Sequence, residues 1–145
     1  MKLLKIARVP AVAVAPEDSI MSAVEKMSDV GIGAVAVVRN GDLVGIFTER
    51  DLLMRVVRPG VSTLNTPISK VMTKNPNVAP LEMEASQAFE FMTAKNIRHL
   101  PIVDKNGKLQ GMLSIRHLMR TCVEKLSHEL EAMNAYLGVD GIGGD

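Results

Sequence analysis

The sequence predicts a mixed α/β fold of the α+β type, built from two β-α-β-β-α repeats that pack through their sheets about a pseudo-two-fold axis. A stretch that begins at Val14 recurs from Val78, about 65 residues later. Each copy alternates short apolar strands with residues at helical spacing. Each copy also holds an Asn-Gly pair, which suits a tight hairpin turn. One repeat of about 50 residues is too small for a stable core, so two copies are expected to pack together.

The first copy predicts a strand, a helix, two strands and a second helix. A short strand is expected at "AVAV", and Ser19 is the expected N-cap of the first helix. The strand Ala34–Val38 turns back at Asn40-Gly41. The returning strand ends in "GIFTERDLL", Gly45–Leu53, where the second helix begins. Apolar residues of the first helix recur every three or four positions, at Ile20, Ala23, Val24, Met27 and Val30.

The second copy repeats this order. A weaker strand is expected at "NPNVAP", an apolar strand at Leu100–Val103 and a hairpin turn at Asn106-Gly107. The phrase "GMLSIRHLM", Gly111–Met119, matches Gly45–Leu53 of the first copy.

The last helix is expected to continue from about Ile115 to Leu137, and its part beyond Thr121 has no counterpart in the first copy. It packs either on its own repeats or against a second subunit, and the second interpretation, a homodimer, is favoured. The apolar stripe consists of Leu118, Cys122, Leu126, Leu130, Met133 and Leu137.

Four segments follow from these elements. The segment "RPGVSTLNTP" breaks the first copy's last helix and links the copies. We therefore expect the first repeat, with a lead-in strand, at 1–62 and the second repeat at 63–120. A helical extension is expected at 121–137 and a flexible Gly-rich tail at 138–145.

Composition excludes several classes of protein. The net charge is +1 and aromatic residues make up 3%, which argues against nucleic-acid and membrane-surface partners. No apolar run reaches the ~18–20 residues that span a membrane, and the opening segment is interpreted as a lead-in rather than a signal peptide. The single cysteine, Cys122, excludes an intrachain disulfide and favours a reducing, cytoplasmic location.

No residues are expected to be catalytic or to bind metal. The three histidines do not form a metal-binding motif, and Cys122 is interpreted as a small core residue. No phosphate-binding glycine loop and no nucleophile placed beside a base is present, so an enzyme or a required cofactor is not expected.

The motifs "GIFTERD", "NIRHLPIVD", "VMTKN" and the Asn-Gly hairpins resemble the CBS-domain pair, also called a Bateman module, over roughly Val9–Arg120. This resemblance implies a stand-alone regulatory module that binds an adenosine-containing ligand between its repeats. AMP, ADP or ATP are the first candidates, with NAD or S-adenosylmethionine as others. It also implies a homodimer and a regulated partner protein, which the sequence does not name.

Thr48 and Asp51 lie where a strand passes into a helix. The free N–H groups and the positive dipole end of a helix start suit a phosphate, and a Thr hydroxyl can donate to it. A carboxylate can accept from both hydroxyls of a ribose. The same Thr-x-x-Asp spacing also predicts a capping box, in which both residues satisfy the helix N–H groups. The second copy keeps Ser114 but replaces the carboxylate with His117, so we expect a degenerate second site there.

The resemblance places Arg98 and His99 of one copy opposite Thr48 and Asp51 of the other. Arg98 suits a phosphate, and His99 adds charge when protonated. Gly33 and Ala34 are their counterparts facing the second site and bring no cation. By resemblance, the adenine is expected against Val12, Ile32, Gly33 and Ile46.

Two functions therefore remain open. A nucleotide sensor needs the set Thr48, Asp51 and Arg98, whereas a ligand-free dimerisation adaptor does not.

Overall fold

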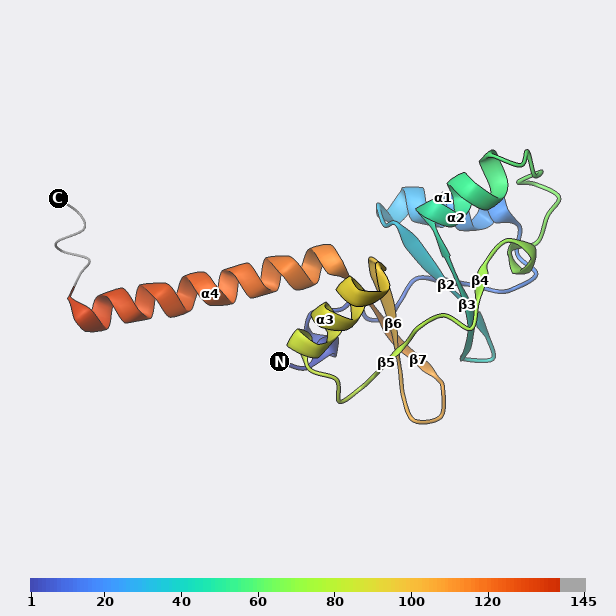
Figure 1. The fold of residues 1–145 in the computed structure, drawn as a ribbon. Helices are drawn as coiled ribbons and strands as arrows, with labels where there is room; N and C mark the ends of the chain where they lie inside the picture. Colours follow the sequence, from blue (N-terminus) through green and yellow to red (C-terminus); the bar gives the residue numbers. More distant parts are fainter. Residues whose placement is uncertain (139–145) are drawn as a thin grey trace.

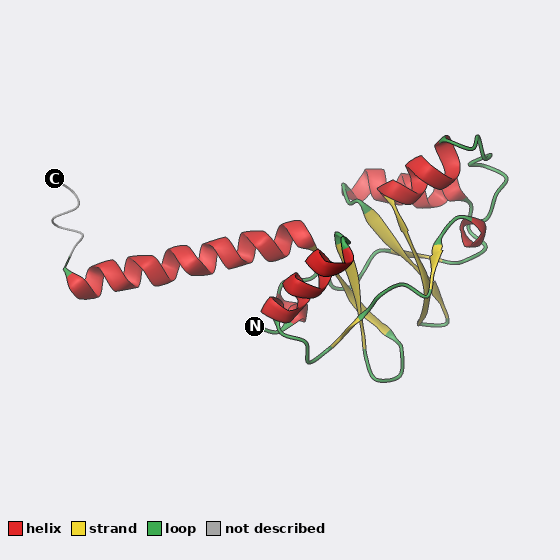
Figure 2. Cartoon of the chain, in the orientation of Figure 1, coloured by secondary structure: helices red, strands yellow, loops and turns green. Residues whose placement is uncertain are grey.

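Two sheets lie at the centre of the molecule, and helices cover the outer face of each one (Figures 1 and 2). The computed structural model describes residues 1–138. The Gly-rich tail expected at 138–145 lies outside the described residues, apart from Gly138, which ends the last helix.

The first sheet has four strands in the order β1-β2-β3-β4, and the second has three in the order β5-β6-β7. In each sheet the first strand pairs in parallel with the second, and the second and third strands form an antiparallel hairpin. The bounds are β1 Ala13–Val14, β2 Ala34–Arg39, β3 Asp42–Thr48, β4 Thr73–Lys74, β5 Ala79–Pro80, β6 His99–Val103 and β7 Leu109–Ser114. The predicted tandem α+β architecture is confirmed.

Four α-helices connect and extend these strands. The short α2 continues into a π-type turn, whereas its counterpart in the second repeat is the regular and much longer α4. The bounds are α1 Ile20–Val30, α2 Glu49–Asp51, the π-type turn η2 Leu52–Val57, α3 Ala85–Lys95 and α4 Ile115–Leu137, with 3-10 turns η1 Leu3–Lys5 and η3 Ile68–Lys70.

Ser19 caps α1 as expected. Its Oγ accepts a hydrogen bond from the Ser22 N–H at 3.1 Å, which satisfies one of the free donors of the first turn. At the other end Gly31 adopts a φ of +78°, a left-handed conformation that ends the helix at little cost for glycine.

The strand β2 shows why the chain forms two layers. Val35 and Val37 point into the core beneath α1, while Ala34 and Ala36 point the other way, as the two-residue period of a strand requires. The alanines pack with Ile46 and with residues of β7 in a core between the sheets. Small side chains on this inner face allow the two sheets to approach closely.

The hairpin tips of the two repeats join at one end of the molecule. The Leu109 N–H donates to the Gly41 carbonyl at 3.1 Å, and Lys108 Nζ lies 2.9 Å from Asp42 Oδ1. The first tip is the expected two-residue turn, with positive φ at both Asn40 and Gly41.

The second hairpin loop is wider than predicted. It spans residues 104–108, because Asp104 Oδ1 accepts from the N–H groups of Asn106 and Lys108 and closes a larger loop. Gly107 alone takes the positive φ there, at +80°, so the Asn-Gly pair does not form the tight turn expected from the sequence.

The lead-in before the first repeat completes the second sheet, and the linker before the second repeat completes the first sheet. Thr73, in the linker, pairs with Ile46 of β3, and Arg8, in the lead-in, pairs with Met112 of β7. Fully buried Leu3 of η1 packs in the core of the second repeat, and Ile68 of η3 packs in that of the first. The start of the chain, which sequence order assigns to the first repeat, therefore packs with the second.

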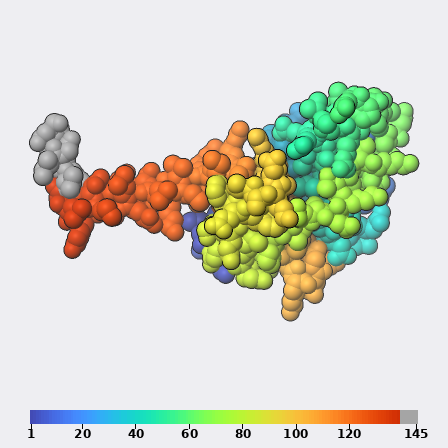
Figure 3. Space-filling model, in the orientation of Figure 1, coloured from blue at the N-terminus to red at the C-terminus, as the bar shows by residue number. Residues whose placement is uncertain are grey.

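Only the beginning of α4 lies on the body of the molecule. Leu118 and Cys122 pack on the core of the second repeat, while the rest of the helix projects away from it (Figures 1 and 3). The predicted bounds of the helix are confirmed, but the alternative in which its extension packs on its own repeats is wrong. Across residues 1–138 no helix combines the length and the hydropathy needed to cross a bilayer, and the cytoplasmic location stays a prediction.

We expect Leu3→Ala to lower the free energy of unfolding by about 2–5 kcal/mol, because the side chain is fully buried and its loss leaves a cavity. Leu4→Ala is the matched control, since Leu4 is 37% exposed and should cost well under half as much. Urea denaturation measures both. Equal effects would contradict the assignment of the lead-in to the second core.

Candidate functional site

A hollow of about 1060 Å³ opens between the two repeats. It lies at the ends of the sheets away from the joined hairpin tips. Its walls include Thr48 and Ser114, the last residues of β3 and β7, and Gly33 and Arg98, which come directly before β2 and β6. The repeat relates these four positions by the pseudo-two-fold axis. The Glu49 N–H donates to the Gly33 carbonyl at 3.0 Å, and the Ile115 N–H donates to the Arg98 carbonyl at 2.9 Å.

Thr48 and Asp51 form the capping box that their spacing predicts. Thr48 Oγ1 accepts from the Asp51 N–H at 3.2 Å, and Asp51 Oδ2 accepts from the Thr48 N–H at 3.1 Å. Both residues also line the hollow. Capping is therefore established here, and it leaves acceptor capacity on the carboxylate, which has about four lone-pair positions.

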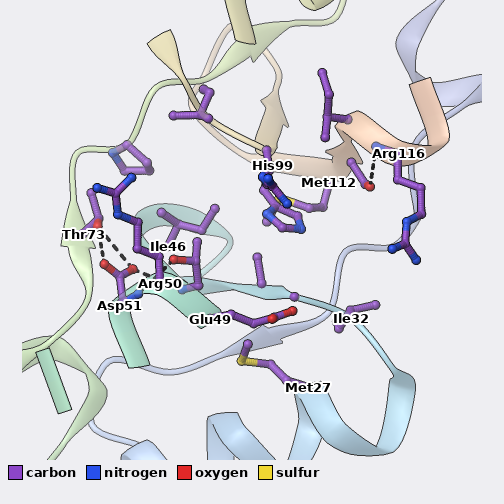
Figure 4. A pocket seen from close by; sticks show the side chains of 18 of the residues that line it. Met27, Ile32, Ile46, Glu49, Arg50, Asp51, Thr73, His99, Met112 and Arg116 are labelled. Carbon is purple, nitrogen blue, oxygen red and sulfur yellow. Dashed lines mark hydrogen bonds between the residues drawn. The ribbon is translucent and has the colours of Figure 1, made fainter. Parts of the chain in front are cut away.

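Two further side chains hold Asp51 in place. The Thr73 hydroxyl lies 3.2 and 3.3 Å from the two carboxylate oxygens (Figure 4). Arg55 Nε lies 3.6 Å from Oδ1. Arg55 also donates to the Met72 carbonyl at 2.8 Å, which ties the first repeat's helix to the linker. Asp51 is 7% exposed, so its carboxylate is fixed and nearly dry at the wall of the hollow.

Gly33 lies where two side chains approach the backbone closely in the middle of the hollow. A Cβ at this position would lie 2.5 Å from Glu49 Oε1 and 3.2 Å from His99 Cε1. Glu49 and His99 therefore meet over the Gly33 backbone, and Figure 4 shows both side chains in the central part of the hollow.

His99 is a neutral group at pH 7. Burial lowers the pKa of its imidazole below the ordinary value of 6.5; neighbouring Glu49 acts to raise it and Arg98 to lower it, but burial dominates. Burial therefore disfavours the protonated form in which His99 would add positive charge, and its contact with a ligand stays a prediction. A neutral imidazole still offers one donor and one acceptor to a ligand.

All residues predicted for the ligand line this one hollow. Arg98 reaches it from the residue before β6 and is exposed to solvent. The expected adenine-contacting residues form an apolar part of the lining, in which Ile46 is buried and the others are at least partly covered: Val12, Ile32, Gly33 and Ile46.

The second half-site is built differently from the first. Ser114 Oγ accepts from the Arg116 N–H at 3.2 Å, whereas Thr48 accepts from the residue three positions on. His117 lines the hollow but makes no capping bond to the Ser114 backbone among the described residues. The capping box of Thr48 and Asp51 therefore has no counterpart at Ser114 and His117.

Sequence reasoning missed several residues of the hollow. Thr73 lies within the "VMTKN" segment, but only the folded chain shows that its hydroxyl reaches Asp51. Four arginines belong to the lining, and their side chains form no ion pair or hydrogen bond within residues 1–138: Arg8, Arg50, Arg98 and Arg116. Comparing the lead-in with the linker 65 residues later would have drawn attention to Arg8.

Comparison with known families agrees with this geometry. The model of the CBS domain matches residues 5–58 and again residues 68–124. The chain belongs to the CBS-domain family. Its two CBS domains correspond to the two repeats, and the hollow lies between them.

Relatives and solved structures support the same assignment. The CBS domain-containing protein CBSX3, mitochondrial, of Arabidopsis thaliana is 33% identical over 126 residues, which cover 83% of this chain and 61% of that protein. The chain spans 22% of the length of a second Arabidopsis relative, CBSCBSPB3. It thus corresponds to only part of these longer proteins.

Among solved structures, the CBS-domain protein ATU1752 of Agrobacterium tumefaciens is 36% identical with a TM-score of 0.73, over 82% of this chain and 94% of that one. The CBS domain protein PAE2072 of Pyrobaculum aerophilum, complexed with AMP, is 25% identical with a TM-score of 0.77. That match covers 88% of this chain and 99% of the other.

Burial lowers the pKa of His99 in the folded chain. As the pH falls, the unfolded chain therefore binds a proton at this position at a higher pH than the folded chain does. Stability from His99 is therefore present above pH 6.5, the ordinary value, and is lost as the pH falls below it. We expect NMR titration to give His99 a midpoint below 6.5, and His99→Gln to lose less stability than wild type between pH 7.5 and 5.5. A midpoint above 6.5 would contradict the burial argument.

Proposed function

We propose that this chain is a regulatory binding module that takes an adenosine-containing ligand in the hollow between its CBS domains and acts on a separate partner protein. AMP, ADP or ATP are the first candidates, with NAD and S-adenosylmethionine as others. The observation that carries the proposal is Asp51, a buried and fixed carboxylate at the wall of a hollow whose lining includes four arginines with no ion pair within residues 1–138.

The chemistry of the lining matches the parts of a nucleotide. The free acceptor positions of Asp51 suit two ribose hydroxyls, and the Arg98 guanidinium suits a phosphate. The apolar part formed by Val12, Ile32 and Ile46 suits a purine, with neutral His99 at its edge. The AMP complex of the Pyrobaculum aerophilum protein supports this choice of ligand.

The fold offers a route from binding to signalling. The sheets are joined at their hairpin tips, and their inner faces meet through small alanine side chains. A ligand that contacts both repeats at the open end favours one angle between the sheets and so changes the outer surface. Ligand binding then shifts the population between two orientations of the sheets. A partner protein that binds one orientation more tightly responds to the ligand.

A ligand-free dimerisation adaptor is the second candidate. It is favoured by the capping box, which accounts for Thr48 and Asp51 without any ligand. It does not account for the fixed hydroxyl of Thr73 on the carboxylate or for the unpaired arginines. Neither candidate requires a catalytic group or a cofactor.

We further infer that α4 pairs with α4 of a second copy. One face of the projecting helix carries apolar residues at alternating spacings of four and three, the pattern of a two-helix coiled coil. We call this apolar face the seam. Because the seam contains no charged side chain, the seams of two copies can pack against each other about a two-fold axis without burying charge. Each seam residue is between 50% and 64% exposed in one chain: Met119, Val123, Leu126, Leu130, Met133 and Leu137.

We expect titration calorimetry with AMP, ADP and ATP to show one ligand per chain, and Asp51→Asn to weaken binding about tenfold or more. The asparagine keeps one oxygen for the Thr48 N–H, but the NH2 group that replaces the second carboxylate oxygen cannot accept from a ribose hydroxyl. Asp42→Asn, at an exposed carboxylate outside the hollow, is the control.

Thermal melting checks that both variants remain folded. Equal binding by Asp51→Asn and wild type would remove Asp51 from the ribose site. No binding of any adenosine ligand by a folded wild type would favour the adaptor and leave Thr48 and Asp51 as a helix cap.

For the dimer, we expect Leu126→Glu to raise the dissociation constant about a hundredfold or more, because it buries two unpaired carboxylates in the seam. Ala135→Glu adds the same charge on the opposite face of α4 and should leave the dimer intact. Sedimentation equilibrium measures both. A wild-type monomer, or a dimer unaffected by Leu126→Glu, would overturn the pairing of α4.

A further inference from the structure

The two halves of the hollow correspond residue by residue through the sheets. Thr73 pairs with Ile46, and Arg8 pairs with Met112, the counterpart of Ile46 in the second repeat. Arg8 bonds both ways with Met112, at 3.0 and 3.1 Å. Arg8 therefore occupies in the second half the position that Thr73 occupies in the first.

This correspondence shows that two replacements occur together. Where the first half holds a carboxylate, Asp51, with a hydroxyl donor, Thr73, the second half holds His117 with Arg8. Neither His117 nor Arg8 has an ion-pair partner in residues 1–138. The second half has thus exchanged a ribose acceptor for donors and positive charge, which is more than the loss of one residue.

The surroundings of this half strengthen its positive character. Arg116 lies in the first turn of α4, and the N-terminal end of that helix adds the positive end of its dipole. Figure 4 shows Arg116 at the side of the hollow away from Asp51 and Thr73, with His99 between them. The Ser114 hydroxyl adds a donor to this group. Glu49, which lies over the Gly33 backbone, is the one carboxylate besides Asp51 among the described lining residues.

We propose that the half of the hollow formed by Arg8, Ser114, Arg116 and His117 is an anion subsite that binds the second and third phosphates of a nucleoside di- or triphosphate. The proposal rests on the proposed function, in which the nucleoside is held by Thr48 and Asp51. The chain then binds one extended ligand across both halves, and it prefers a polyphosphate tail over a monophosphate.

The size of the hollow is consistent with one extended ligand. Its volume of about 1060 Å³ lies slightly above the range of small-molecule pockets, which span about 300–1,000 Å³. The ribose end and the anion subsite belong to the same continuous space. Arg98, which lines the same hollow, suits the first phosphate.

The test compares adenosine, AMP, ADP, ATP and inorganic pyrophosphate by titration calorimetry on wild type and on Arg8→Thr/His117→Asp. This double variant installs in the second half the residues of the first. We expect wild type to bind ATP about tenfold or more tightly than AMP, and the double variant to lose most of that preference. Lys105→Thr, which removes a cation outside the hollow, should keep it.

Each outcome separates the subsite from the proposed function. Equal affinity of wild type for AMP and ATP would overturn the subsite and leave the nucleotide module standing. No binding of any nucleotide would overturn the proposed function itself. The assignment to a nucleotide tail would be overturned if pyrophosphate bound wild type as tightly as ADP does and if the double variant lost this binding. If the double variant unfolds on melting, Arg116→Gln, at an exposed side chain, replaces it with the same expected loss of preference.

Discussion

The exchange of edge segments is the constraint on which the rest of the molecule depends. Each sheet ends on a short antiparallel pairing with a segment from outside its own repeat. The linker before the second repeat completes the first sheet, with Thr73 beside Ile46. The lead-in before the first repeat completes the second sheet, with Arg8 beside Met112. Each segment also sends one fully buried apolar residue into the core that it completes, Ile68 or Leu3. The two repeats are therefore linked covalently and by packing, and the hollow between them is lined by both.

Much of this fold follows from patterns that the sequence states directly. The apolar run Ala34–Val38 and the Asn40-Gly41 pair predict a strand and a turn that the structure contains. The apolar residues at spacings of three and four up to Leu137 predict the long helix. The pairing of Arg8 could not be predicted in this way, because an isolated bridge leaves no periodic signal. The width of the second hairpin loop escaped prediction for a similar reason, since it depends on the side chain of Asp104.

The candidate site illustrates how one residue serves two purposes. Asp51 satisfies a backbone donor at the start of α2 and also presents a carboxylate to the hollow. The Thr-x-x-Asp spacing predicts the cap, and the repeat predicts that the second copy departs from it. Neither pattern reveals that burial keeps His99 neutral, because the cover over its ring comes from residues such as Gly33 and Glu49 that are distant in sequence.

The position of α4 gives the molecule a lever. The helix starts at the wall of the hollow, directly after Ser114, and continues without a break to Leu137. Its 23 residues correspond to a rod about 35 Å long. Because the rod is rigidly attached to the second repeat at Leu118, a rotation of that repeat by only about 10° displaces the far end by roughly 6 Å. Small angular changes between the sheets are thus amplified into movements comparable with one turn of a helix, at a distance from the place where they arise.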